Sequence, residues 1–115
     1  MSKIALIHCG FHKTGSTVFQ SLLKKNDKEL NYYVPKTFRL NFYPINHAPL
    51  AWQIIQDERF DKNDIELEKF KKEIYNKNKI LLSSEDFSLV LSNLKTKKIF
   101  EKILSDYNIN YLCFF

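Results

Sequence analysis

The sequence is poor in glycine, proline and cysteine, and it lacks any long hydrophobic run. Its 115 residues include two glycines, three prolines and two cysteines, so low-complexity tracts and a disulfide framework are not expected. Cys9 and Cys113 lie in apolar, strand-like runs outside any Cys-x-x-Cys pair, and we expect them to be buried reduced thiols. Without a run of about 18 apolar residues or a signal peptide, the chain is expected to have no membrane span and to be cytoplasmic.

The residues that are present indicate one packed domain with a basic surface. Hydrophobic residues make up 44% of the chain and include ten Phe and six Tyr, which favours a globular core over disorder. The net charge is +5, and most lysines stand beside acidic residues, as is typical of a solvated surface. A net positive charge also suits a small anionic ligand. Because no arginine-rich tract or aromatic-interleaved basic patch occurs, we do not expect a nucleic acid partner.

Short apolar runs alternate with helical periodicity along the chain. Strands are expected at residues 4–9, 80–82 and 108–115, and the first is apolar enough to be buried on both faces. Helical spacing follows residue 17 and recurs near 46–55, from 64 to 75 and from 96 to 107, where Ile99, Phe100, Ile103 and Leu104 are expected to face inward. An ordered loop is expected over 30–46. This order predicts a three-layer α/β fold with a parallel sheet.

Both glycines lie in one stretch, HCGFHKTGST, between the first strand and the first helix. Gly10 and Gly15 have the spacing of a phosphate-binding loop, and such a loop gathers backbone N–H groups at a helix N-terminus. The Walker pattern G-x-x-x-x-G-K-[ST] is not met, because Ser16 stands where the lysine is required and Lys13 precedes the second glycine. The stretch therefore predicts an anion site in which Lys13 is a mobile cation.

The residues from Lys13 to Thr17, KTGST, resemble the 5′-phosphosulfate loop of PAPS-dependent sulfotransferases, in particular the bacterial and carbohydrate branches of that family. The resemblance continues through NHAPLAWQI and ILLSSEDFS and covers essentially the whole chain as an N-terminal portion. It implies a P-loop-like fold and transfer of a sulfuryl group from PAPS to a hydroxyl or amine acceptor, expected to be carbohydrate-like, with release of PAP. An essential metal is not implied, because a sulfuryl group carries less negative charge than a phosphoryl group.

The resemblance also assigns site residues. The 5′-phosphosulfate would be held by Lys13, Thr14, Gly15, Ser16 and Thr17, with His12 beside them. Lys13 would also act catalytically, by stabilising charge on the bridging oxygen as the sulfur–oxygen bond breaks. Family members place a general base after the strand that corresponds to 80–82, which makes Glu85 the second catalytic candidate.

Structural roles compete for some of these residues. Ser84, or Ser83 with Asp86, is equally suited to cap a short helix that follows, which would leave Glu85 as a first-turn acid. His47 fits either the acceptor side of the site or a helix cap, and His8 fits a packed position. No zinc or iron constellation stands out in the sequence.

The resemblance covers only one part of the family's nucleotide site. In the family, the arginine and serine that hold the 3′-phosphate of PAPS come after the strand matched by 108–115. We therefore expect residues 1–115 to be the 5′-phosphosulfate-binding part of one domain that is incomplete at its C-terminus, and its catalytic activity is left open.

Two other interpretations stay open beside the resemblance. A divergent P-loop kinase or NTPase would use Glu85 as a magnesium-linked acid. A non-catalytic remnant of a broken gene would be aggregation-prone or stabilised by a partner.

Overall fold

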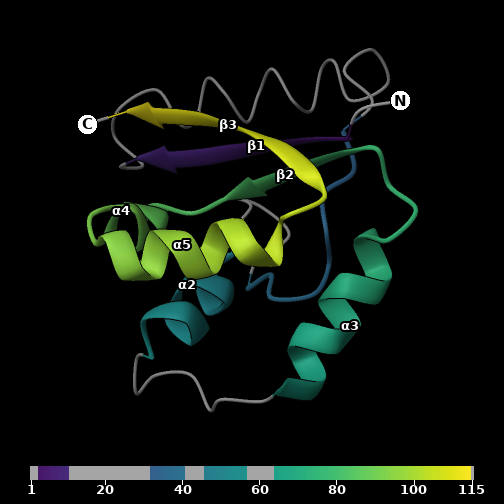
Figure 1. Cartoon of the computed structure of the whole chain (residues 1–115), viewed down its shortest axis with the longest axis horizontal. Helices are drawn as coiled ribbons and strands as arrows, with labels where there is room; N and C mark the ends of the chain where they lie inside the picture. Colours follow the sequence, from purple (N-terminus) through teal and green to yellow (C-terminus); the bar gives the residue numbers. More distant parts are fainter. Residues whose placement is uncertain (1–2, 11–31, 41–45, 57–63, 115) are drawn as a thin grey trace.

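The computed structural model describes residues 3–10, 32–40, 46–56 and 64–114 (Figure 1). Within them the chain is a small α/β domain with a parallel sheet of three strands, β1 (Lys3–Gly10), β2 (Lys79–Ser83) and β3 (Tyr107–Phe114). The strand order is β2-β1-β3, so the first strand is central. All three predicted strands and the parallel pairing are confirmed, with β1 and β2 each one residue longer at both ends than expected.

The central strand follows from its sequence. Its branched and apolar side chains suit a strand covered on both faces, and Ala5, Ile7 and Cys9 are fully buried. Cys9 is disulfide-bonded, so the prediction of a reduced thiol is wrong for this residue. Its Cα partner across the β1–β3 register is Cys113, the other cysteine of the chain. The register, which the sequence pattern did not specify, brings the two positions together.

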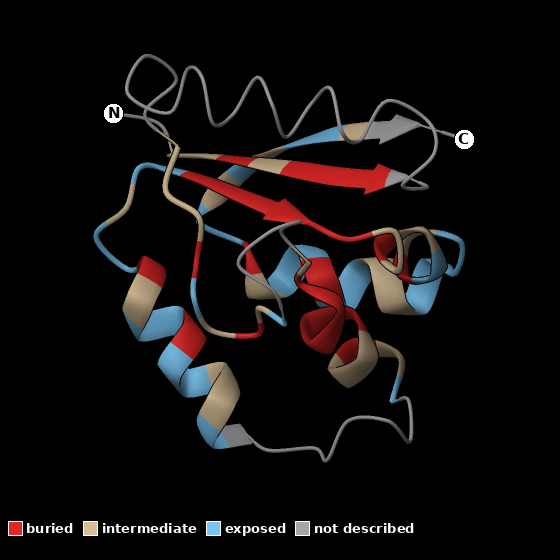
Figure 2. Ribbon diagram, turned by 180° about the vertical axis from the view of Figure 1, so that it is seen from behind, coloured by how far each residue is buried: buried red, intermediate tan, exposed pale blue. Residues whose placement is uncertain are grey.

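Four helices occupy the described part of the chain: α2 (Ala48–Ile55), α3 (Asp64–Ile74), α4 (Phe87–Leu91) and α5 (Leu94–Ile103). Helices α2, α4 and α5 lie against one face of the sheet, and α3 stands to one side (Figure 1). In Figure 2 the buried colour follows β1, β2 and most of α2, whereas α3 and α5 are largely intermediate or exposed. The core there includes Leu50, Phe70, Ile80, Leu82, Phe87, Val90, Phe100 and Leu104.

Helix α5 differs from its predicted range of 96–107. It begins two residues earlier, where Asn93 accepts a hydrogen bond from the Lys95 N–H at 2.8 Å as a side-chain cap. It ends at Ile103, and Tyr107, the last residue of the predicted helix, belongs to β3. Phe100 and Leu104 are buried as expected, but Ile99 is 39% exposed. Ile103 is half-buried. The prediction for Ile99 is wrong because the elements around α5 cover only part of its predicted apolar face, the part that holds Phe100 and Leu104.

The loop over 32–40 is ordered, which confirms the predicted loop for the part that the structure describes. Tyr33 forms a parallel bridge with Ile80 at the outer edge of β2. The carboxylate of Glu73 on α3 accepts hydrogen bonds from Tyr33 Oη at 2.5 Å and from the Lys36 and Thr37 backbone N–H groups at 2.7 and 3.0 Å. Burial alone would raise the pKa of Glu73, but these hydrogen bonds to the charged form lower it overall.

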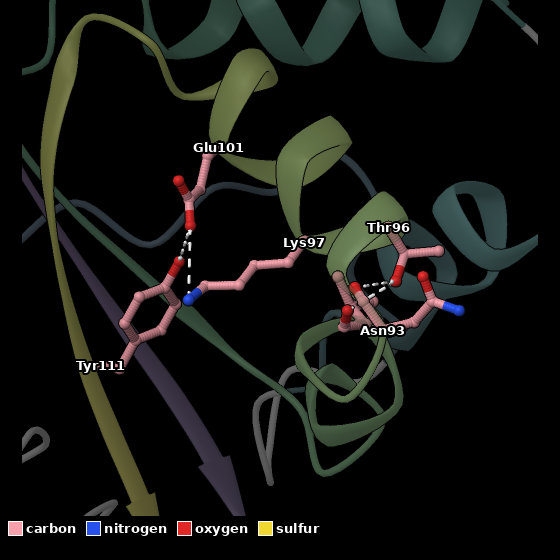
Figure 3. A network of polar contacts seen from close by, with 6 residues as sticks. Asn93, Thr96, Lys97, Glu101 and Tyr111 are labelled. Carbon is pink, nitrogen blue, oxygen red and sulfur yellow. Dashed lines mark hydrogen bonds and ion pairs between the residues drawn. The ribbon is translucent and has the colours of Figure 1, made fainter.

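A surface network joins α5 to β3 (Figure 3). Tyr111 donates its hydroxyl to Glu101 at 3.3 Å, and Lys97 lies 3.9 Å from the same carboxylate oxygen. Burial raises the pKa of Tyr111 to about 12, and the Glu101 carboxylate adds to the shift. In the same view, Thr96 donates its hydroxyl to the Asn93 carbonyl at 3.0 Å. Because both partners of the ion pair are exposed, we attribute little stability to it.

Candidate functional site

The strand order defines where a ligand would bind. After β1 the chain pairs β2 on one side of it and then β3 on the other, so the direction of winding changes at β1. In open parallel sheets, ligands bind outside the carboxyl ends of the strands at such a switch point. β1 ends at Gly10, the first of the two glycines in the stretch HCGFHKTGST. His12 and Lys13 to Thr17 lie outside the described residues, so the site is built here from the strand ends around Gly10.

β2 delivers a pair of serines to this edge. Ser83 lies opposite His8 in the register, and its hydroxyl is hydrogen-bonded to His8 Nδ1 at 2.7 Å. The Ser84 N–H donates to the His8 carbonyl at 3.0 Å, so the segment that follows β2 still runs beside β1 for one residue. All three residues are buried. Glu85, the next residue, therefore emerges at the same edge of the sheet as Gly10.

His47 is a buried connector between α2 and β2. The Ser83 N–H donates to its Nδ1 at 3.0 Å, and its Nε2 is 2.9 Å from the Pro35 carbonyl oxygen. Because a backbone N–H only donates and a carbonyl only accepts, the ring is the neutral form with its proton on Nε2. Burial is the main cause that lowers the pKa of His47 to about 4.

His47 occupies the N-cap position of α2, as the helix-cap interpretation predicted, but its side chain makes no cap bond. Instead, Asn46 Oδ1 accepts from the Ala48 N–H at 2.9 Å. The ring is fully buried and both nitrogens are engaged by Ser83 and Pro35, so its side chain is not exposed to an acceptor. Sequence reasoning missed the connection because Ser83 is far away along the chain.

The residues after β2 form a hydrogen-bonded turn into α4. Ser84 Oγ accepts from the Asp86 N–H at 3.1 Å, and the Glu85 carbonyl accepts from the Ser88 N–H at 3.1 Å. The indole N–H of Trp52 on α2 donates to Asp86 Oδ2 at 2.8 Å. Ser84 thus does organise the helix start, as the structural alternative predicted, and Asp86 is held by Trp52. Glu85 is half-buried within this turn, and its role as a base stays a prediction.

The edge therefore combines hydrogen-bonded polar groups with two acids in one turn, Asp86, which is bonded to Trp52, and the half-buried Glu85. Hydrogen bonds connect the turn to neighbouring elements. Ser83, which precedes the turn, is bonded to His8 and to His47, and Trp52 on α2 donates to Asp86 within it. Sequence reasoning found Ser84 and Glu85 but missed Trp52. The sequence offered one signal for Trp52: it is the single tryptophan and stands beside an apolar helix face. In the described ranges, no three His, Cys, Asp or Glu side chains come together as a metal-binding group. No helix there is long and apolar enough to cross a membrane.

Comparison of the chain with protein-family models, with curated proteins and with solved structures finds no match. The fold alone therefore defines the class of this protein. The protein is a small α/β domain with a parallel sheet and a polar, tightly braced turn at the carboxyl edge of its first two strands.

Proposed function

We propose that this protein binds PAPS at the carboxyl end of β1 and transfers its sulfuryl group to a hydroxyl or amine acceptor of carbohydrate-like kind. One observation carries the proposal: the stretch that resembles a 5′-phosphosulfate loop directly follows the central strand at the topological switch point. The proposal includes a P-loop-like, three-layer fold and a cytoplasmic location. Parallel pairing of β1 with both neighbours supports the fold.

The chemistry assigns a role to each candidate. Lys13, Thr14, Gly15, Ser16 and Thr17 hold the 5′-phosphosulfate, with His12 beside them. In the transfer step the acceptor oxygen or nitrogen forms a bond to sulfur while the bond between sulfur and the bridging oxygen breaks. Lys13 stabilises the negative charge that develops on that bridging oxygen, which leaves on PAP. Glu85 takes the proton that the acceptor loses. The braced turn of residues 84–86 supports this role, because a general base must be held in position.

Binding of PAP tests the proposal directly. We expect isothermal titration calorimetry to show PAP binding that Lys13→Ala weakens by about tenfold or more, since a charge-assisted hydrogen bond contributes about 1.5–3 kcal/mol. Lys69→Ala is the matched control, because this exposed lysine on α3 makes only a 3.4 Å pair with Glu66 among the described contacts. Magnesium-dependent ATP binding without any response to PAP would contradict the proposal and favour a kinase or NTPase.

Two substitutions in the turn separate catalysis from structure. Glu85→Gln should lower the rate of transfer from PAPS by about 10²–10⁴-fold, the usual contribution of a general base, with little change in stability. Ser84→Ala should instead lower the free energy of unfolding by about 1 kcal/mol, because it removes the hydroxyl that accepts from the Asp86 N–H. Transfer rates and urea denaturation of both variants give the comparison. Undiminished transfer by Glu85→Gln would remove this residue from the mechanism.

A further inference from the structure

Three lysines line a cavity at the opposite, amino edge of the sheet. This cavity of about 280 Å³ opens between the ends of α3 and α5 and the starts of β1 and β3. Its lining includes the lysines Lys3, Lys71 and Lys102, which come from three different elements. We propose that this cavity binds a phosphate monoester, with the phosphate among the three ammonium groups. The proposal does not rest on the proposed function, because Lys13 and Glu85 take no part in it.

Lys3 is a fixed cation in one wall of the cavity. Its ammonium group donates to the Tyr75 carbonyl at 2.7 Å and lies over the rings of Tyr75 and Tyr107 at 5.6 and 5.3 Å from their centroids. Tyr107 is itself held, because its hydroxyl lies 2.8 Å from the Ile74 carbonyl and 2.7 Å from the Lys77 carbonyl. An ammonium has three N–H donors, so one bond to a carbonyl does not use all of them.

Lys71 and Lys102 complete the cationic walls. Each lies in the last turn of its helix, where the helix dipole favours a cation. The dipoles account for a lysine in the last turn of each helix. They do not account for Lys71 and Lys102 lining one cavity together with Lys3. Asp106 is the one acidic residue among those that line the cavity.

The chemistry of the lining selects the ligand class. Three lysines and one aspartate give the lining a formal charge of +2, which matches a phosphate monoester dianion better than a singly charged sulfate ester. Lysine binds phosphate as a point charge and does not need the bidentate geometry of arginine. Beside the charges, Tyr75 is 77% exposed and lines the cavity together with Ile103, so the organic part of an ester has an apolar surface to contact. The volume of about 280 Å³ lies just below the usual range of small-molecule sites, which begins at about 300 Å³.

Titration of the 115-residue chain with phenyl phosphate and with inorganic phosphate, followed by ¹H–¹⁵N NMR at about 0.15 M salt, tests the proposal. We expect phenyl phosphate to shift amide signals of residue 3, the end of α3 and residues 102–107. The Lys71→Ala/Lys102→Ala double variant should weaken its binding about tenfold or more, and Asp106→Asn should tighten it. Lys69→Ala, an exposed lysine of α3 outside the lining, should stay within about twofold of the wild type.

Failure of this cavity proposal can be told apart from failure of the proposed function. Lys13→Ala should leave phenyl phosphate binding at the amino edge unchanged, whether or not PAP binds at the carboxyl edge. Absence of localised shifts, or equal binding by the double variant, would overturn the cavity as a site. Inorganic phosphate binding as tightly as phenyl phosphate would overturn the monoester assignment and leave free phosphate as the ligand. The unchanged spectrum of the remaining residues in each variant checks that it is folded.

Discussion

The free energy of unfolding should fall by about 3 kcal/mol between pH 7 and pH 4 through His47 alone. In the folded protein the pKa of His47 is lowered to about 4 from an ordinary value of 6.5, chiefly by burial. Between these values the unfolded chain binds a proton at this residue and the folded chain does not. Stability therefore decreases as the pH falls through this window, because each unit of difference in pKa corresponds to about 1.36 kcal/mol. Protonation would also place a second donor opposite the Ser83 N–H.

Urea denaturation at several pH values between 4 and 7 measures this effect. His47→Gln keeps an amide that can donate to the Pro35 carbonyl but removes the titrating ring. The variant should be less stable at pH 7 and should lose the part of the pH dependence that belongs to His47. Contributions of the carboxylates and of the other histidines are common to both proteins and cancel in the difference. Parallel pH profiles for the two proteins would contradict the assignment of a neutral, buried His47.

Phe100→Ala should destabilise the protein by about 3–5 kcal/mol, the usual range for a buried phenylalanine. Phe100 is fully buried in the core, where α5 packs against α4. Its ring centroid lies 5.3 Å from that of Phe87, with the planes tilted by 40°, so the variant loses both burial and an aromatic pair. Since small domains are stable by only about 5–15 kcal/mol, this loss is a large share of the total.

Leu94→Ala on the same helix is the control, because Leu94 is 67% exposed and its truncation should cost about 0.5 kcal/mol or less. Phe100→Leu keeps most of the volume and gives a folded variant for comparison if Phe100→Ala does not fold. The denaturation midpoints should rank the variants in the order Leu94→Ala, Phe100→Leu, Phe100→Ala, from most to least stable. A similar midpoint for the two alanine variants would mean that α5 does not pack as described.

The strands and the main helices were predictable because local periodicity reflects burial. The run from Ile4 to Cys9 is apolar at every position but one and forms the central strand, and α3 ends within one residue of its predicted limit. The edge that carries the candidate site was predictable as well, since parallel strands present their carboxyl ends together. The limits of α5 and the exposure of Ile99 were not, because they depend on which side of the helix its neighbours cover.

The sequence by itself determined the α/β pattern, the position of the glycine-rich stretch after the first strand, and Glu85 after the second. Only the tertiary structure decided which polar groups meet. His47 with Ser83, Glu73 with Tyr33 and Trp52 with Asp86 are pairs separated by 36, 40 and 34 positions, and Lys3 joins Lys71 and Lys102 at one cavity. Such contacts leave no periodic trace along the chain, because they arise from the register of the strands and the packing of helices on the sheet.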